Sequence, residues 1–334
     1  MKRLYAALLF SAIIGMAGAR NLTAQNIDGY RVTGPHAHKN LAVFLIHGRN
    51  RIDGTNFISL QEAMDRKAVV VHETGSVNQL MITNNSKANI FIMSGDIVKG
   101  GKQDRVIQYN YIVPPKTEKM PINSFCVESG RWEKREGENL HAFTSSNERI
   151  ASKDLKMSVK KEKSQSGVWN GVSRIQDRLG EKVGEVRGSS ETSLQLTLEH
   201  EKLKKARDEY ARTLAGIIRG QKDVVGYAFA INGKINSAEI FASSALFAKL
   251  WAKLVNASIV EAISDYRAGA AYKKVDAGDI RRFLREAEKG NTVSDLDVSK
   301  RTRVIEKETP GNLLYETRDS AGGDRWINRS YMAK

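Results

Sequence analysis

The first part of the chain after residue 40 is dominated by short apolar runs. Residues 41–46 form a run typical of a buried strand, and residues 60–67 are predicted to form a short helix. β-branched or aromatic residues then recur in runs that predict further strands at 69–73, 77–83, 89–93, 106–113 and 122–128. Pairs such as Gly75-Ser76 and Gly100-Gly101 separate these runs as turns. Residues 40–132 are therefore predicted to be mostly β.

Later segments change to a helical period. Apolar residues recur at three- and four-residue spacing, which predicts helices at 164–179, 198–219, 243–266 and 280–289, the last of them capped by residues 276–279. Two hairpins are expected, one turning at Asn232-Gly233 and one within residues 303–315. The basic stretch 149–163 has the alternation of an exposed edge strand, on which lysines would prevent edge pairing. The pattern predicts an α+β fold, with a β-rich N-terminal half packed against a helical C-terminal half.

The N-terminus has the pattern of a secretory signal peptide. Lys2 and Arg3 precede an apolar run that ends at Ala17, and small residues follow it. The run is too short to span a membrane comfortably, which favours cleavage after Ala19 or Ala24 over an uncleaved anchor. We therefore expect residues 1–24 to be a signal peptide and the mature protein to be exported, periplasmic or extracellular, without a transmembrane span.

Composition narrows the choice of partners. The chain of 334 residues has a formal net charge of +15, with 53 Lys and Arg against 38 Asp and Glu. An exported basic protein is more suited to an anionic ligand or envelope component than to nucleic acid, although lysines that merely solvate the surface give the same balance. The single cysteine, Cys126, excludes an intramolecular disulfide, and its apolar neighbours favour a buried thiol.

One polar run is distinctive. Its candidate ligand-binding residues are Gly100, Gly101, Lys102, Gln103 and Arg105. Adjacent glycines bring backbone N–H groups close to an anion, and the neighbouring cations would add charge. The spacing is not that of a phosphate-binding Walker loop. The alternative is a tight turn in which the glycines adopt positive φ.

A second polar run follows at residues 126–132, with Glu128 and Arg131 as further candidate ligand-binding residues. Cys126 and Glu128 lie on one face of a strand, but no histidine is brought near them as a base. The pair His36 and His38 lacks a third and fourth ligand, so we predict no metal site, and no cofactor is indicated.

Taken together, the runs Gly100–Arg105 and Cys126–Trp132 resemble the signature of a prokaryotic family, the ADP-ribosylglycohydrolase and rhodanese-phosphatase-superfamily-associated protein domain. Similar segments follow in the same order at 165–169, 226–233 and 239–241, the last leading into the helix at 247–262. The resemblance implies one domain over residues 40–265, between an N-terminal extension at 25–39 and a C-terminal extension at 266–334 that holds a helix and a β-hairpin. It implies no reaction or catalytic residue.

Three functions remain open. The first is a non-catalytic binding or interaction protein of the cell envelope with an anion-facing loop. The second is a hydrolase acting on a phosphorylated or ADP-ribosyl compound, with Asp96, Asp104 or Glu128 as general base. The third is a purely structural domain, in which Gln103 and Arg105 only hold neighbouring strands.

Overall fold

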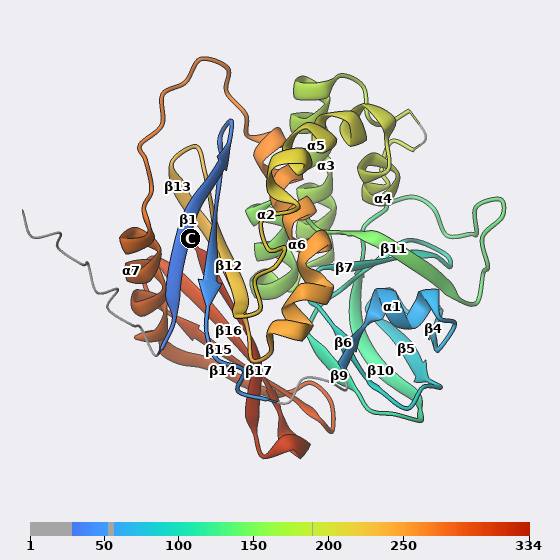
Figure 1. The fold of residues 1–334 in the computed structure, drawn as a ribbon. Coiled ribbons are helices and arrows are strands. Elements are labelled where there is room, and N and C mark those ends of the chain that lie inside the picture. Colours follow the sequence, from blue (N-terminus) through green and yellow to red (C-terminus); the bar gives the residue numbers. More distant parts are fainter. Residues whose placement is uncertain (1–28, 53–56, 189) are drawn as a thin grey trace, which may run out of the picture.

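The computed structural model describes residues 29–52, 57–188 and 190–334. The predicted signal peptide and residues 25–28 lie outside the described residues. Strands and helices are mixed along the chain, and neighbouring strands are antiparallel in almost every pair, so the predicted α+β class is confirmed (Figure 1). The helices lie mainly in the middle of the chain, since the C-terminal segment 291–333 returns to strands.

The largest sheet has eight antiparallel strands. In spatial order they are β1 (Arg31–His38), β2 (Leu41–His47), β12 (Val224–Ile231), β13 (Lys234–Phe241), β17 (Arg325–Ala333), β16 (Asn312–Asp319), β15 (Thr302–Glu308) and β14 (Asn291–Asp297). Side chains alternate along a strand, so Val43 and Leu45 enter one core while Phe44 and Ile46 enter another. The sheet therefore requires a cover on each face.

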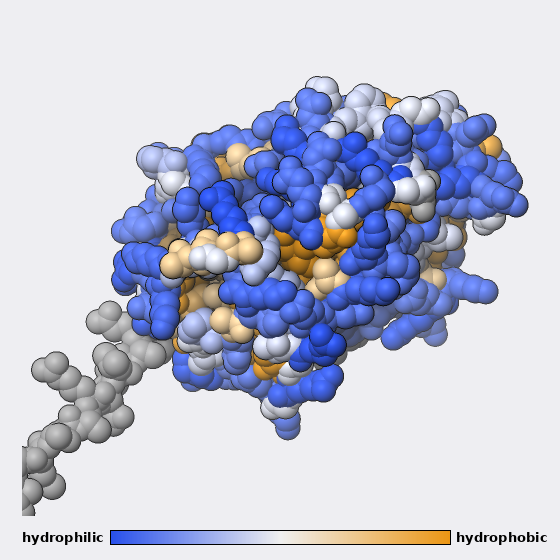
Figure 2. Space-filling model, turned by 90° about the horizontal axis from the view of Figure 1, so that it is seen from above, coloured by the Kyte–Doolittle hydropathy of each residue, from blue (hydrophilic) through white to orange (hydrophobic). Residues whose placement is uncertain are grey.

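Helices provide both covers (Figure 1). Seen from above, the surface of the molecule is mostly hydrophilic, with hydrophobic residues exposed near the middle of that face (Figure 2). On one face of the sheet α7 (Ala277–Glu288) buries Ile280 and Leu284. The other face packs against α6 (Ser244–Ser264), beside which lie α3 (Gln165–Val183) and α5 (Glu201–Leu214). The long helix expected at 198–219 is shorter at both ends, because α5 begins at Glu201 after its cap His200 and ends at Leu214. A separate short helix, α4 (Leu194–Leu198), precedes it.

A β-rich lobe packs on the far side of these helices. Its six-stranded sheet has the order β11 (Phe143–Arg149), β7 (Asp96–Gly100), β8 (Arg105–Ile107), β10 (Thr117–Cys126), β5 (Gln79–Asn84) and β4 (Val69–His72). A small sheet of β3 (Phe57–Ser59), β6 (Asn89–Ile92) and β9 (Tyr111–Val113) and the helix α1 (Leu60–Asp65) complete it. The turn between β7 and β8 is the predicted anion-facing loop.

The single strand expected at 106–113 is two strands in different sheets. The chain leaves β8 at Ile107 and enters β9 at Tyr111. Between them the side chain of Asn110 donates hydrogen bonds to Thr317 at 2.8 Å and Asn328 at 2.9 Å. A buried amide with partners in the distant C-terminal strands interrupts the pairing, and this cannot be derived from an apolar run.

The prediction of an edge strand within residues 149–163 is wrong. The segment forms α2 (Lys153–Met157) and one turn of π-helix (Ser158–Glu162). Leu155 and Val159, four residues apart, are fully buried on one side and join the core that includes α3. The lysines are not edge guards, since Lys156 pairs with Glu261 at 2.9 Å and Lys161 with Glu308.

The two segments predicted as extensions contribute strands to the large sheet. β1 forms one edge of it, and β17 pairs with β13 in its centre. The helix and hairpin expected within 266–334 are present as α7, which Asp276 caps, and as the pair β15 and β16. No helix in the described ranges is both long and apolar enough to cross a membrane.

Candidate functional site

The loop between β7 and β8 depends on its two glycines. Gly100 and Gly101 have φ values of +116° and +58°, conformations that side chains disfavour. A Cβ at Gly101 would also lie 2.6 Å from the ring of Phe143 and 2.8 Å from Oε2 of Glu73. The glycines therefore form the tight turn with positive φ that the sequence left as an alternative.

Three successive backbone N–H groups of this loop, at Gly100, Gly101 and Lys102, already have acceptors within the chain. The N–H of Gly100 donates to Oδ1 of Asp104 at 3.0 Å, and that of Lys102 donates to Oε2 of Glu73 at 3.1 Å. Gly101 donates to the carbonyl of Asn139 at 3.2 Å. The protein's own carboxylates thus take the place that an external anion would have in a phosphate-binding loop.

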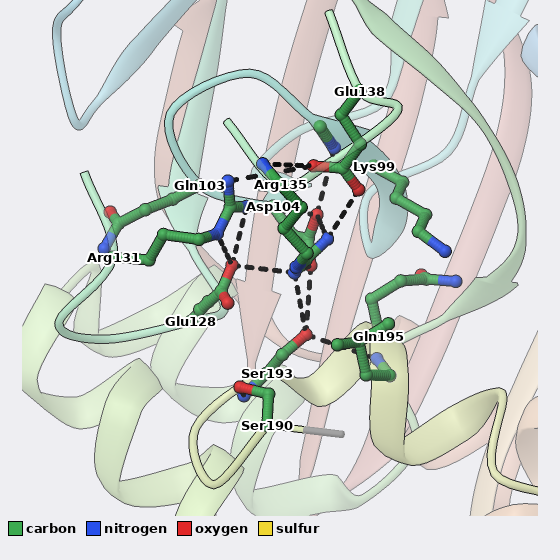
Figure 3. Close-up of polar contacts among 12 residues, drawn as sticks. Lys99, Gln103, Asp104, Glu128, Arg131, Arg135, Glu138, Ser190, Ser193 and Gln195 are labelled. Atoms are coloured by element: carbon green, nitrogen blue, oxygen red, sulfur yellow. Dashed lines mark hydrogen bonds and ion pairs between the residues drawn. The ribbon is translucent and has the colours of Figure 1, made fainter. Parts of the chain in front are cut away.

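Two carboxylates and two arginines form a buried charge cluster next to the loop, here called the arginine cluster (Asp104, Glu128, Arg131 and Arg135). Oε2 of Glu128 accepts from Nε of Arg131 at 2.8 Å and from Nη2 of Arg135 at 2.9 Å. Arg135 also donates to Oδ1 of Asp104 at 3.2 Å. Both carboxylates are almost fully buried, and Figure 3 shows the guanidinium groups converging on them.

Partners from distant segments complete the arginine cluster. Ser193, the N-cap of α4, donates to Oδ2 of Asp104 at 3.0 Å, and Glu138 pairs with Arg135 at 2.7 Å (Figure 3). Arg131 also reaches the carbonyl of Gly101 at 3.2 Å. The candidate residues Glu128 and Arg131 therefore do meet the loop, so the two motifs of the sequence belong to one site.

Arg105 lies in a separate buried pair. Its side chain is fully buried, 3.3 Å from the carboxylate of Glu73, and donates to the carbonyl of Gln103 at 2.8 Å. Gln103 is also buried. These two candidates stabilise the turn from inside the lobe and do not face solvent.

Sequence reasoning missed several partners in this region, namely Glu73, Arg135, Glu138 and Ser193. Arg135 and Glu138 lie in a loop without any period, and their only signal is the density of charges at residues 133–138. Ser193 contacts a residue 89 positions away, and Glu73 contacts one 32 positions away. Contacts at such separations arise from the fold alone.

The surface beside the arginine cluster carries two exposed indole rings and a lysine, which we call the tryptophan patch (Lys102, Trp132 and Trp169). Trp132 is 44% exposed and Trp169 36%. The ammonium of Lys102 lies 5.0 Å from the ring centre of Trp132, and Trp169 donates to the carbonyl of Glu128 at 3.2 Å. Among the described residues, Lys102 has no carboxylate partner within ion-pair distance, whereas Arg131 and Arg135 have several.

Cys126 is buried, as predicted from its neighbours. Burial raises the pKa of its thiol to about 11, an effect that the nearby Arg105 only partly offsets. The thiol therefore stays protonated at neutral pH, which does not suit a nucleophile. Among the described residues no group of three or more metal-binding side chains is close enough to hold an ion.

The third carboxylate considered as a base, Asp96, lies elsewhere. It is buried at the start of β7, on the wall of a cleft formed with α6. The arginine cluster and Asp96 are thus two distinct polar regions.

Comparison with known proteins identifies the family. The model of the ARG and Rhodanese-Phosphatase-superfamily-associated Protein domain matches residues 29–332. The match continues past residue 265, where we expected the resemblance to end, and includes α7 and the last four strands of the large sheet. No curated protein and no solved structure matches the chain. The chain belongs to the ARG and Rhodanese-Phosphatase-superfamily-associated Protein domain family.

Proposed function

We propose that the protein is an exported, non-catalytic binding protein that holds an anionic component of the cell envelope on the tryptophan patch. The observation that carries this proposal is the ammonium of Lys102, which lies over the exposed ring of Trp132 and has no carboxylate partner in the part of the chain that the structure describes. Indole rings at a surface bury apolar area at low entropic cost, and a lysine beside them adds attraction for an anion. An acidic polysaccharide uses both groups, because its sugar rings stack on indole and its acidic groups pair with ammonium.

The arginine cluster supports this assignment as a scaffold. Asp104 and Glu128 each contact both arginines, so their charges are committed to Arg131 and Arg135. A general base must be free to accept a proton from a substrate. The arrangement favours a role in fixing the segment that carries Trp132, three residues before Arg135 and next to Arg131.

The proposal modifies the anion-facing loop expected from the sequence. Gly100 and Gly101 shape the turn, Gln103, Arg105, Glu128 and Arg131 stabilise it, and Lys102 is the residue left to face the ligand. The hydrolase alternative would instead require Asp96, and the structural alternative predicts that changes at Lys102 have no effect on any ligand.

Retention on an immobilised acidic polysaccharide tests the binding role. Lys102→Met and Trp132→Ala should each elute at clearly lower salt than the unmodified protein, because they remove the local cation and the stacking ring. Lys87→Met removes the same charge from an exposed site in the turn between β5 and β6 and serves as the matched control. Equal losses in Lys102→Met and Lys87→Met would mean that only net charge matters and would refute the local site.

The export part of the proposal rests on residues 1–24 and needs its own measurement. N-terminal sequencing of protein recovered from intact cells should give a chain that begins after Ala19 or Ala24. Protein that retains Met1 in the cytosol would refute export and favour a nucleotide-related ligand instead.

A further inference from the structure

A second polar site lies in the cleft between the β-rich lobe and the helices α5 and α6. Its cavity of about 370 Å³ adjoins a larger one of about 640 Å³, and Asn147, Glu148 and Arg207 line both. Residues from α1, β7, the β11 strand and α6 form the walls. Neither cavity includes a residue of the tryptophan patch, so this region is independent of the proposed binding function.

Asp96 presents an incompletely bonded carboxylate to this cleft. Its side chain is about 3% exposed, and its Oδ2 accepts the backbone N–H of Met93 at 3.1 Å. Its Oδ1 is buried without a hydrogen-bond partner in the described structure. The nearest cation is Nζ of Lys253, at 3.7 Å, which is beyond hydrogen-bond distance. A buried carboxylate oxygen without a donor costs free energy unless another group supplies one.

A second acceptor that lines the same cavity is also unsatisfied. Nε2 of Gln61 donates to Asp65 at 2.9 Å, while its Oε1 is buried and has no partner among the described residues. By contrast, Glu148 and Arg207 in this cleft satisfy each other through two hydrogen bonds of 2.7 and 2.9 Å. The cleft therefore has two acceptors without a donor, Oδ1 of Asp96 and Oε1 of Gln61. The ammonium of Lys253 can itself donate a hydrogen bond to a ligand.

The charges on the cleft walls define the ligand further. The carboxylates Glu62, Asp96 and Glu148 face as many cations, which are Arg207, Lys249 and Lys253. Equal numbers of positive and negative side chains give the cleft no preference for a charged ligand. The ammonium of Lys253 beside Asp96 would also repel a metal cation. A hydroxyl group matches the pair, because it donates one hydrogen bond and accepts another.

We propose that this cleft binds a neutral polyhydroxyl compound, a mono- or disaccharide, with one hydroxyl placed between Oδ1 of Asp96 and Nζ of Lys253. The hydroxyl donates to the carboxylate and accepts from the ammonium, whose flexible stem moves aside to admit it. A second hydroxyl donates to Gln61. The cavity of about 370 Å³ is in the range of small-molecule sites, and the adjoining cavity leaves room for a second sugar ring.

Binding of neutral saccharides to the full-length protein tests the proposal. Isothermal titration calorimetry and ligand-observed NMR would be run with glucose, galactose, mannose, N-acetylglucosamine and their common disaccharides. Glycerol and glucose 6-phosphate would serve as a non-sugar polyol and a charged sugar. At least one neutral saccharide should bind, more tightly than glycerol and at least as tightly as the phosphate.

Variants then locate the binding. Lys253→Met and Asp96→Asn should each weaken the saccharide at least ten-fold, about the loss expected for a hydrogen bond to a charged group. Lys289→Met removes an exposed lysine next to the C-terminus of α7 and should leave the affinity unchanged. The proposal is overturned if none of the neutral saccharides binds, or if binding survives in Lys253→Met. The Lys253→Met variant keeps the buried carboxylate of Asp96, so it still tests the site if Asp96→Asn does not fold. Loss of binding in Lys102→Met alone would assign the saccharide to the tryptophan patch and equally refute the cleft.

Discussion

The arginine cluster and the Asp96 cleft are built from the same kinds of side chain but differ in how their charges are used. In the arginine cluster the buried carboxylates of Asp104 and Glu128 each contact two guanidinium groups. In the cleft Oδ1 of Asp96 has no hydrogen-bond partner in the described structure, and Lys253 lies just too far away. The carboxylates of the arginine cluster are paired within the chain, whereas Asp96 keeps one carboxylate oxygen without a donor among the described residues.

This difference teaches where to look for function in a chain without a catalytic motif. A dense set of charged residues in the sequence attracts attention, yet a fully paired cluster is most useful as a scaffold. Removing one partner from such a cluster leaves an uncompensated buried charge, which is costly. Unpaired groups on a cavity wall are the more informative sign of a ligand. The following variants measure how far the two regions differ.

The largest effect is expected from Arg135→Met. It removes the guanidinium that contacts Asp104, Glu128 and Glu138, and leaves two buried carboxylates with fewer partners. We expect the free energy of unfolding to fall by roughly 3 kcal/mol or more. Urea denaturation followed by tryptophan fluorescence would measure it, with Trp132 as a nearby reporter.

The control for that change is Arg187→Met, which breaks an exposed pair with Asp177 at 2.7 Å and should cost less than about 1 kcal/mol. If Arg135→Met were as mild as Arg187→Met, the arginine cluster would not be a scaffold. Its arginines would then be available to a ligand, and the contrast with the cleft would disappear.

The regular elements were predictable where apolar spacing decides them. The helix α6 buries the side chains that its period indicates, the apolar run 41–46 forms the buried strand β2, and the Asn232-Gly233 hairpin forms as expected. Prediction failed where a polar side chain with a distant partner interrupts a run, as Asn110 does. It also failed at 149–163, since Leu155 and Val159 fit either period and only packing against α3 selects the helical one.

The candidate site was predictable in part for a similar reason. The Gly100–Arg105 turn and the Glu128–Arg131 run are local features, and the structure brings them together through Arg131 and Gly101. Their chemistry was not predictable, because it depends on which partners each charge finds. Glu73 and Asn139 accept hydrogen bonds from the loop N–H groups. Both are distant from the loop in the sequence, so no local pattern predicts these contacts.

The second prediction concerns Lys160 in the π-helical turn, a partly buried cation. Its Nζ donates to Oγ of Ser330 at 3.1 Å and lies 4.9 Å from the ring centre of Tyr315. Burial lowers its pKa to about 8; Arg149 and Lys156 add to the effect, while Glu239 and Glu306 oppose it. Between pH 8 and the ordinary lysine pKa near 10.5, the unfolded chain binds more protons at this amine than the folded one, so its contribution to stability rises with pH.

Comparison of the unmodified protein with Lys160→Met isolates this contribution, because other groups that titrate in the same range, such as Cys126, are common to both. From pH 7 to pH 10 the unmodified protein should gain roughly 2 kcal/mol relative to the variant, as measured by urea denaturation at each pH. If the free energy of unfolding changed with pH in the same way in both proteins, the pKa of Lys160 would not be lowered by folding, and the prediction would be wrong.

The smallest expected difference tests how rigidly the loop is held. Gly101→Ala places a methyl group against Phe143 and Glu73 in a backbone conformation with φ of +58°, whereas Gly137→Ala meets a similar φ of +77° with no atom within 4 Å. Both variants carry the cost of the backbone conformation, about 1 kcal/mol, and only the first adds steric overlap. Gly101→Ala should therefore lose roughly 1 kcal/mol more than Gly137→Ala in thermal or urea unfolding. Equal losses would mean that the loop yields to the methyl group, and Lys102 would then be carried on a mobile turn instead of a fixed one.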